Sequence, residues 1–160
     1  MSGRPGVRLA LDWGDARIGV AACDALGTLA YPVETIHQAA DEGYVLSALR
    51  RLAAEYEPAG FVLGLPRHLR GAEGASAAKV RERASWLAGH FPDAEVRLVD
   101  ERLTTVSAAR DLRQAGKSAR QQRRIIDQAA AVAILNHALE LERHTGQTAG
   151  ELVGTGRTED

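Results

Sequence analysis

The sequence contains little cysteine, few aromatic residues and no long apolar run. Cysteine occurs once, as Cys23, in 160 residues, and aromatic residues make up 4%. One cysteine excludes an internal disulfide framework and any zinc site built on two or more cysteines, which is typical of a reducing compartment; an intermolecular disulfide through Cys23 stays open. No apolar run approaches the ~20 residues of a membrane span and the N-terminus lacks a signal-peptide pattern, so we expect a cytoplasmic protein with no membrane partner.

An excess of charge of one sign is also missing. The chain has 20 Lys and Arg against 21 Asp and Glu, a net charge of −1, so a nucleic-acid binder would need a local basic patch. Residues 110–124 provide one, with six positive residues and one negative, a net charge of +5. A solvated helix face is the ordinary explanation of such a run, but this one lacks the interleaved acids typical of solvated faces.

The pattern of apolar residues predicts a mixed α/β fold in a single domain. Strands are expected at 7–13, 17–23, 29–36, 60–64 and 95–99, and helices at 41–56, 77–91, 104–114 and 125–143. The first two strands read as a hairpin, and Pro32 favours an edge position for the third. This order predicts a five-stranded sheet, with strands 1–3 antiparallel and strands 4–5 parallel, flanked by helices. Residues 1–145 would form the domain, and residues 146–160 a mobile C-terminal tail.

Three acids are candidates for chemistry. Asp12 ends the first strand, Glu101 follows the fifth, and Asp127 projects from a stripe of small residues on the last helix. Each has an ordinary explanation: a turn former, a solvated partner of Arg102, and a first-turn acid at a helix dipole. Together they would repel one another, and hard divalent cations such as Mg²⁺ or Mn²⁺ explain the cluster best. Cations bridged by carboxylates activate water in phosphodiester hydrolysis.

A glycine-rich loop at 64–76 precedes a predicted helix and is a natural anion site. It lacks the Gly-Lys-Ser/Thr of a Walker A loop, so a nucleoside triphosphate is not favoured. Arg67 and Arg70 in this loop would contact a nucleic-acid backbone, or they are ordinary surface residues.

Four spaced motifs resemble the YqgF/RuvX family, over residues from about 8 to 141. They are Leu11-Asp12-Trp13-Gly14 with Arg17-Ile18-Gly19-Val20-Ala21, Val62-Leu63-Gly64-Leu65-Pro66, Asp100-Glu101-Arg102-Leu103-Thr104-Thr105, and Ile126-Asp127-Gln128-Ala129-Ala130-Ala131. Trp13, Asp15 and Ala16 depart from the family pattern. Trp13 beside Asp12 would suit base stacking, although a core position fits a tryptophan better. The hairpin also resembles an ATPase phosphate loop, but such ATPases need two domains and the length allows one.

The resemblance implies an RNase H-like fold in which Asp12, Glu101 and Asp127 are metal-binding catalytic acids and Arg17 is the family arginine. It implies a cytoplasmic, metal-dependent nuclease, expected to process the 5′ end of precursor 16S rRNA as a monomer or homodimer. A Holliday junction resolvase acting on branched DNA and a non-catalytic ribosome-assembly module are the alternatives. The expected nucleic-acid contacts are Arg17, Arg67, Arg70, Arg102, Arg113, Lys117, Arg120, Arg123 and Arg124.

Overall fold

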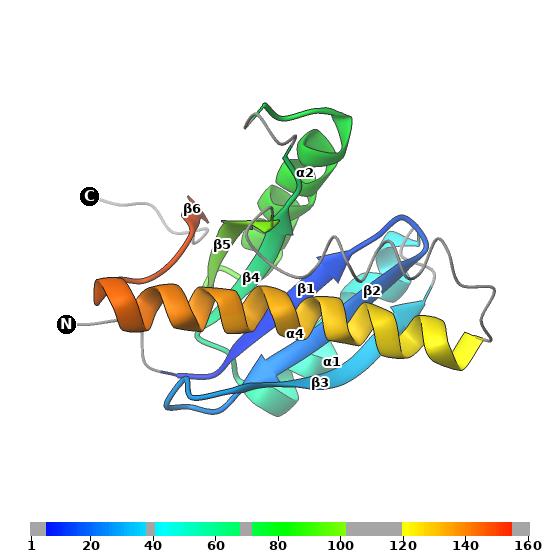
Figure 1. Cartoon of the computed structure of the whole chain (residues 1–160). Helices are drawn as coiled ribbons and strands as arrows, with labels where there is room; N and C mark the ends of the chain where they lie inside the picture. Colours follow the sequence, from blue (N-terminus) through cyan, green and yellow to red (C-terminus); the bar gives the residue numbers. More distant parts are fainter. Residues whose placement is uncertain (1–5, 38–40, 68–71, 102–119, 155–160) are drawn as a thin grey trace.

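A mixed sheet forms the centre of the molecule (Figure 1). The structure is a computed structural model, and it describes residues 6–37, 41–67, 72–101 and 120–154. Its strands are β1 (Arg8–Trp13), β2 (Arg17–Cys23), β3 (Ala30–His37), β4 (Gly60–Leu65), β5 (Glu95–Asp100) and β6 (Glu151–Gly154), in the order β3-β2-β1-β4-β5-β6. The helices are α1 (Glu42–Tyr56), α2 (Ala75–His90) and α4 (Arg120–Thr145).

The first five strands confirm the expected α/β arrangement, in which strands 1–3 are antiparallel and strands 4–5 are parallel. β2 pairs antiparallel with β1 and β3, whereas β4 runs parallel to β1 and β5 runs parallel to β4. β3 lies at the edge of the sheet, as Pro32 predicts. The ladder skips a residue there, because Val20 pairs with Glu34 and Ala21 pairs with Pro32. The bulge accommodates a residue that has no N–H to donate.

The expected strand count of five is corrected to six, because part of the expected tail extends the sheet. β6 pairs antiparallel with β5. Two contacts secure this segment: the Ala149 N–H donates to Glu142 Oε2 at 2.9 Å, and Arg81 forms an ion pair with Glu151 at 2.8 Å. The sequence signal for β6 is weak, since the strand is short and its partners are remote in the chain. The division of the chain at residue 145 stays a prediction.

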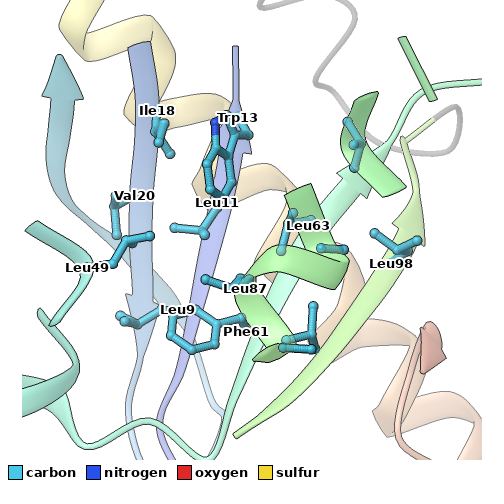
Figure 2. Packing of buried hydrophobic residues seen from close by; sticks show 14 of the residues in the cluster. Leu9, Leu11, Trp13, Ile18, Val20, Leu49, Phe61, Leu63, Leu87 and Leu98 are labelled. Atoms are coloured by element: carbon cyan, nitrogen blue, oxygen red, sulfur yellow. The ribbon is translucent and has the colours of Figure 1, made fainter. Parts of the chain in front are cut away.

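The two faces of the sheet carry different cores. Leu9, Leu11 and Trp13 of β1 pack beneath α1 and α2, and Figure 2 shows Leu49 and Leu87 of these helices lying over the strands. On the opposite face α4 crosses the sheet (Figure 1) and packs on small residues such as Ala10. Successive residues of β1 therefore alternate between the two cores, and both faces of the strand are buried.

Local signals explain where the helices begin and end. Asp41 caps α1 by accepting a hydrogen bond from the Tyr44 N–H at 3.2 Å, and the helix ends at Glu57, in a left-handed conformation with φ 46°, before Pro58. The helix expected at 104–114 lies outside the described residues. In the part of the chain that the structure describes, no helix is both long and apolar enough to cross a membrane.

A buried ion pair joins the first strand to the last helix. Arg8 donates two hydrogen bonds to Glu142, at 2.5 and 2.7 Å, and the two residues are 3% and 8% exposed. Burial disfavours the charged guanidinium, but the carboxylate of Glu142 outweighs this effect and the pKa of Arg8 is raised. Cys23 is fully buried nearby, and burial raises the pKa of its thiol. A buried thiol is not available for a disulfide between native molecules.

Candidate active site

Asp12 lies near the end of β1, on the face of the sheet covered by α4. It is 3% exposed and stands opposite Gly19 of β2, so the two residues share a face. A Cβ added to Gly19 would lie 2.1 Å from the backbone oxygen of Asp127. Helix α4 therefore touches the sheet at Gly19, and this contact places Asp127 beside Asp12.

Asp127 is fixed by an arginine from the hairpin. Arg17 Nε donates to Asp127 Oδ2 at 2.6 Å, and the two side chains are 26% and 2% exposed. Because α4 begins at Arg120, Asp127 lies two turns inside the helix, beyond the reach of the terminal dipole. The position of Asp127 is therefore explained by its burial against the sheet and not by stabilisation of the helix dipole. The nearby α4 residues Ala130, Ala131 and Ile134 are fully buried, which confirms the inward-facing stripe.

The Glu101 side chain extends over Gly64, on the face of the sheet that also carries Asp12. It follows the end of β5 and is 6% exposed. A Cβ added to Gly64 would lie 2.9 Å from Glu101 Oε2. The last registered pair of β1 and β4 is Leu11 with Leu63, so Gly64 comes next to Asp12 in the sheet. A side chain at Gly64 would overlap Glu101 Oε2 and Ile134 Cδ1, so the absence of a side chain there allows Glu101 to lie close to this strand.

The three carboxylates supply only oxygen donors, the type that Mg²⁺ and Mn²⁺ prefer. Within residues 6–37, 41–67, 72–101 and 120–154, no three His, Cys, Asp or Glu side chains form a compact metal cluster. Mg²⁺ does not require one, because it usually binds through one or two carboxylates and completes its shell with water and substrate phosphate. The donor chemistry of the three carboxylates fits such a cation.

The predicted nucleic-acid contacts are only partly described. Arg17 pairs with Asp127, and Arg67 lies 3.5 Å from Glu73 and 3.9 Å from Asp100. Both arginines are partly exposed, and each lies beside an acidic side chain: Arg17 beside Asp127, and Arg67 beside Glu73 and Asp100. Arg70, Arg102, Arg113 and Lys117 lie outside the described residues. Arg120, Arg123 and Arg124 belong to the first turns of α4, before Asp127, and their side chains lie outside the described part.

The sequence did not indicate a second feature, a cavity of about 380 Å³ lined by Trp13, Asp15, Lys79 and Arg83. Arg83 Nη1 donates to the Trp13 carbonyl at 2.9 Å, and Arg83 Nη2 donates to Asp15 Oδ1 at 3.1 Å. The hydrogen bond from Arg83 and the charge of Lys79 lower the pKa of Asp15. The available signal was the spacing of four residues between Lys79 and Arg83, which places both on one face of the predicted helix.

Trp13 itself is a core residue. It is 9% exposed and meets Trp86 edge-on, with ring centroids 5.9 Å apart. The core position expected for this tryptophan is confirmed, and a base-stacking role is not supported.

Comparisons with known proteins match this chain to a family model, to curated relatives and to a solved structure. A family model described as "RuvX: Holliday junction resolvase" matches residues 6–141. A curated protein named "Putative pre-16S rRNA nuclease" from Streptomyces coelicolor is 54% identical over 148 residues, covering 92% of this chain and 88% of the relative. Its namesake from Nocardioides sp. is 52% identical over 154 residues, covering 94% and 97%. Among solved structures, Thermus thermophilus RuvC in complex with a Holliday junction substrate has a TM-score of 0.48 and 17% identity, covering 88% of this chain and 97% of that one.

Proposed function

Because this chain belongs to the RuvX family, we propose that it is a nuclease that hydrolyses phosphodiester bonds, with precursor 16S rRNA as its substrate. One observation carries the proposal: Asp12, Glu101 and Asp127 are buried on a single face of the sheet, gathered around Gly19 and Gly64. Burying several carboxylates together is costly unless a cation compensates their charge. A site of this kind, near the partly exposed Arg17 and Arg67, suits the cleavage of a polyanion.

Asp12 and Glu101 would hold the divalent cation, because both lie next to Gly64 on the face of the sheet that α4 covers. When bound there, Mg²⁺ or Mn²⁺ supplies an activated water and stabilises negative charge on the phosphate. Asp12 is held by the ladder of β1, and Asp127 is held by Arg17 and by the contact of α4 with Gly19. Arg17 would thus act as a positioning residue, and Arg67 would contact the substrate backbone. Acting on precursor rRNA, the protein would work in the cytoplasm.

The test is cleavage of a precursor 16S rRNA fragment in Mg²⁺ by purified Asp12→Asn protein. The variant keeps the shape of the side chain and removes its charge, so we expect cleavage to fall at least a hundredfold while folding is retained. Asp93→Asn is the matched control, since Asp93 is exposed and precedes the opposite, amino end of β5. Thermal unfolding followed by circular dichroism checks both variants. Equal cleavage by Asp12→Asn and wild type would refute the site.

A second candidate is the resolution of branched DNA, favoured by the description of the matching family model. The chemistry would be unchanged, and a two-fold dimer would present two sites to a four-way junction. Cleavage rates on a junction and on the rRNA fragment, with Asp12→Asn as the control for contaminating nuclease, separate the two. Metal-independent binding with no turnover on either substrate would instead support a non-catalytic assembly module.

A further inference from the structure

We propose that the cavity lined by Lys79, Arg83 and Trp13 binds a backbone phosphate of the nucleic-acid strand, and that Asp15 occupies the position of this phosphate in the free protein. The cavity lies on the α1–α2 side of β1, directly after Asp12 in the chain. A strand that crosses the end of β1 would pass from one site to the other. The identity of the ligand rests on the proposed nuclease function.

A single carboxylate oxygen of Asp15 contacts both positively charged side chains of the cavity. Asp15 Oδ1 lies 3.1 Å from Arg83 Nη2 and 3.5 Å from Lys79 Nζ. A non-bridging phosphate oxygen at the same point would receive the same two contacts. Arginine and lysine bind phosphate well in this way, through directed N–H donors and a point charge respectively.

Arg83 is fixed in advance for this role. Its Nη1 donates to the Trp13 carbonyl at 2.9 Å, and its guanidinium lies 5.7 Å from the centre of the Trp13 ring. The side chain is only 24% exposed, so its freedom is already restricted before a ligand arrives. An arginine held in place loses less entropy on binding a phosphate than a free surface arginine does.

Helix α2 adds to the positive field of the cavity. Ser76, in its first turn, lines the cavity, the N-cap residue is Gly74, which has no side chain with which to cap the helix, and the first turn contains no acid. Backbone N–H groups at such a terminus favour anions. The neighbouring Glu73 is held by Arg81 at 2.8 Å, so its charge is compensated by another residue.

The side chain of Asp15 can leave the cavity when a ligand binds. It belongs to the turn between β1 and β2, and its side chain is 75% exposed. Exposed ion pairs contribute little stability, so the carboxylate can swing into solvent without disturbing the sheet. Without Asp15, the two positive charges of Lys79 and Arg83 face the cavity.

Equilibrium binding measures this directly. Fluorescence anisotropy with a labelled precursor-rRNA stem-loop, in EDTA to prevent turnover, is recorded over a series of salt concentrations. We expect Lys79→Gln to weaken binding about fivefold and to reduce the slope of log K against log salt by about one, because one phosphate contact is lost. Asp15→Asn should tighten binding by about the same factor, because it removes the competing carboxylate.

Two variants control for the general effect of net charge. Arg51→Gln removes a positive charge from α1, where Arg51 pairs with Glu34 away from the cavity, and Glu55→Gln removes a negative charge from the same helix. The proposal is overturned if Lys79→Gln binds like Arg51→Gln and Asp15→Asn binds like Glu55→Gln. The fluorescence of Trp13, read in a Trp86→Phe background, should also change on saturation with the RNA, and no change would likewise count against the cavity.

These outcomes are separate from the fate of the proposed function. If the binding differences appear but no substrate is cleaved, the nuclease proposal fails and the phosphate cavity stands. If Asp12→Asn abolishes cleavage while the cavity variants bind like their controls, the phosphate cavity fails and the nuclease proposal stands.

Discussion

Gly64 separates Asp12 from Glu101, and its replacement by alanine tests the geometry of the site most directly. The added Cβ would lie 2.8 Å from Ile134 Cδ1 and 2.9 Å from Glu101 Oε2. Both distances are below the contact limit of real Cβ atoms, so at least one neighbour must move. Ile134 is fully buried in the packed core beneath α4, and it has little room to do so.

The size of the effect follows from these contacts. Overpacking a filled core by one methyl group costs about 1–3 kcal/mol, and the carboxylate of Glu101 would be pushed away from Asp12. We therefore expect Gly64→Ala to lower the free energy of unfolding by about 2 kcal/mol and to reduce cleavage at least tenfold. The Gly64→Ala/Ile134→Val double variant removes the clashing Cδ1 and should regain part of the stability without regaining the activity, because the contact with Glu101 remains.

Urea unfolding gives the stability, and cleavage of the rRNA fragment gives the activity. Alanine substitutions at two other glycines provide reference values for the change in the free energy of unfolding. Gly89 is a helical position with nothing within 4 Å of an added Cβ, so Gly89→Ala should be neutral or stabilising by up to about 1 kcal/mol. Gly19→Ala should cost more than Gly64→Ala, since its Cβ would meet backbone atoms of Asp127. If Gly64→Ala were as stable and as active as Gly89→Ala, the placement of Glu101 over Gly64 would be refuted.

The remaining predictions concern stability and accessibility. Glu142→Gln should cost about 3–5 kcal/mol, because it leaves the Arg8 guanidinium buried without its counter-charge; urea unfolding measures this, and a loss below about 1 kcal/mol would contradict it. Cys23 should not react with a thiol reagent in the native protein and should react fully in urea, and rapid native labelling would contradict its burial. Arg81 lowers the pKa of Glu151 below its ordinary 4.5, so the stabilisation is complete above that pH and is lost as the pH falls through the lowered value. Stability profiles of wild type and Arg81→Gln should therefore converge on acidification, and a constant difference would refute the pairing.

The α/β class, the strand order along the chain and the three acids could be predicted because they depend on local pattern. Alternation in residues 8–13 determines which residues of β1 face α4, and Asp12 follows from that alternation. The stripe that includes Ala130 and Ile134 likewise shows that Asp127 faces inward. The family motifs added the metal-binding role proposed for these acids, which spacing alone left open.

Other features depend on contacts between segments remote in sequence. β6 pairs with β5, and Glu142 and Arg81 contact the chain around Ala149 and Glu151, whereas the local signal in residues 146–154 is weak. The same holds for the cavity, since Asp15 meets Lys79 and Arg83 only when α2 packs beside the first hairpin.

By itself, the sequence determined that the chain has no internal disulfide, because it contains one cysteine, and that any contact with a polyanion must be local, because the net charge is −1. Residue pattern determined which side chains point inward. Only the tertiary structure decided that Gly19 and Gly64 are the empty positions around which Asp12, Glu101 and Asp127 gather. The physical reason is that a glycine contributes nothing to the periodicity of apolar residues. Its effect depends on which atoms of other segments the fold brings close to its Cα.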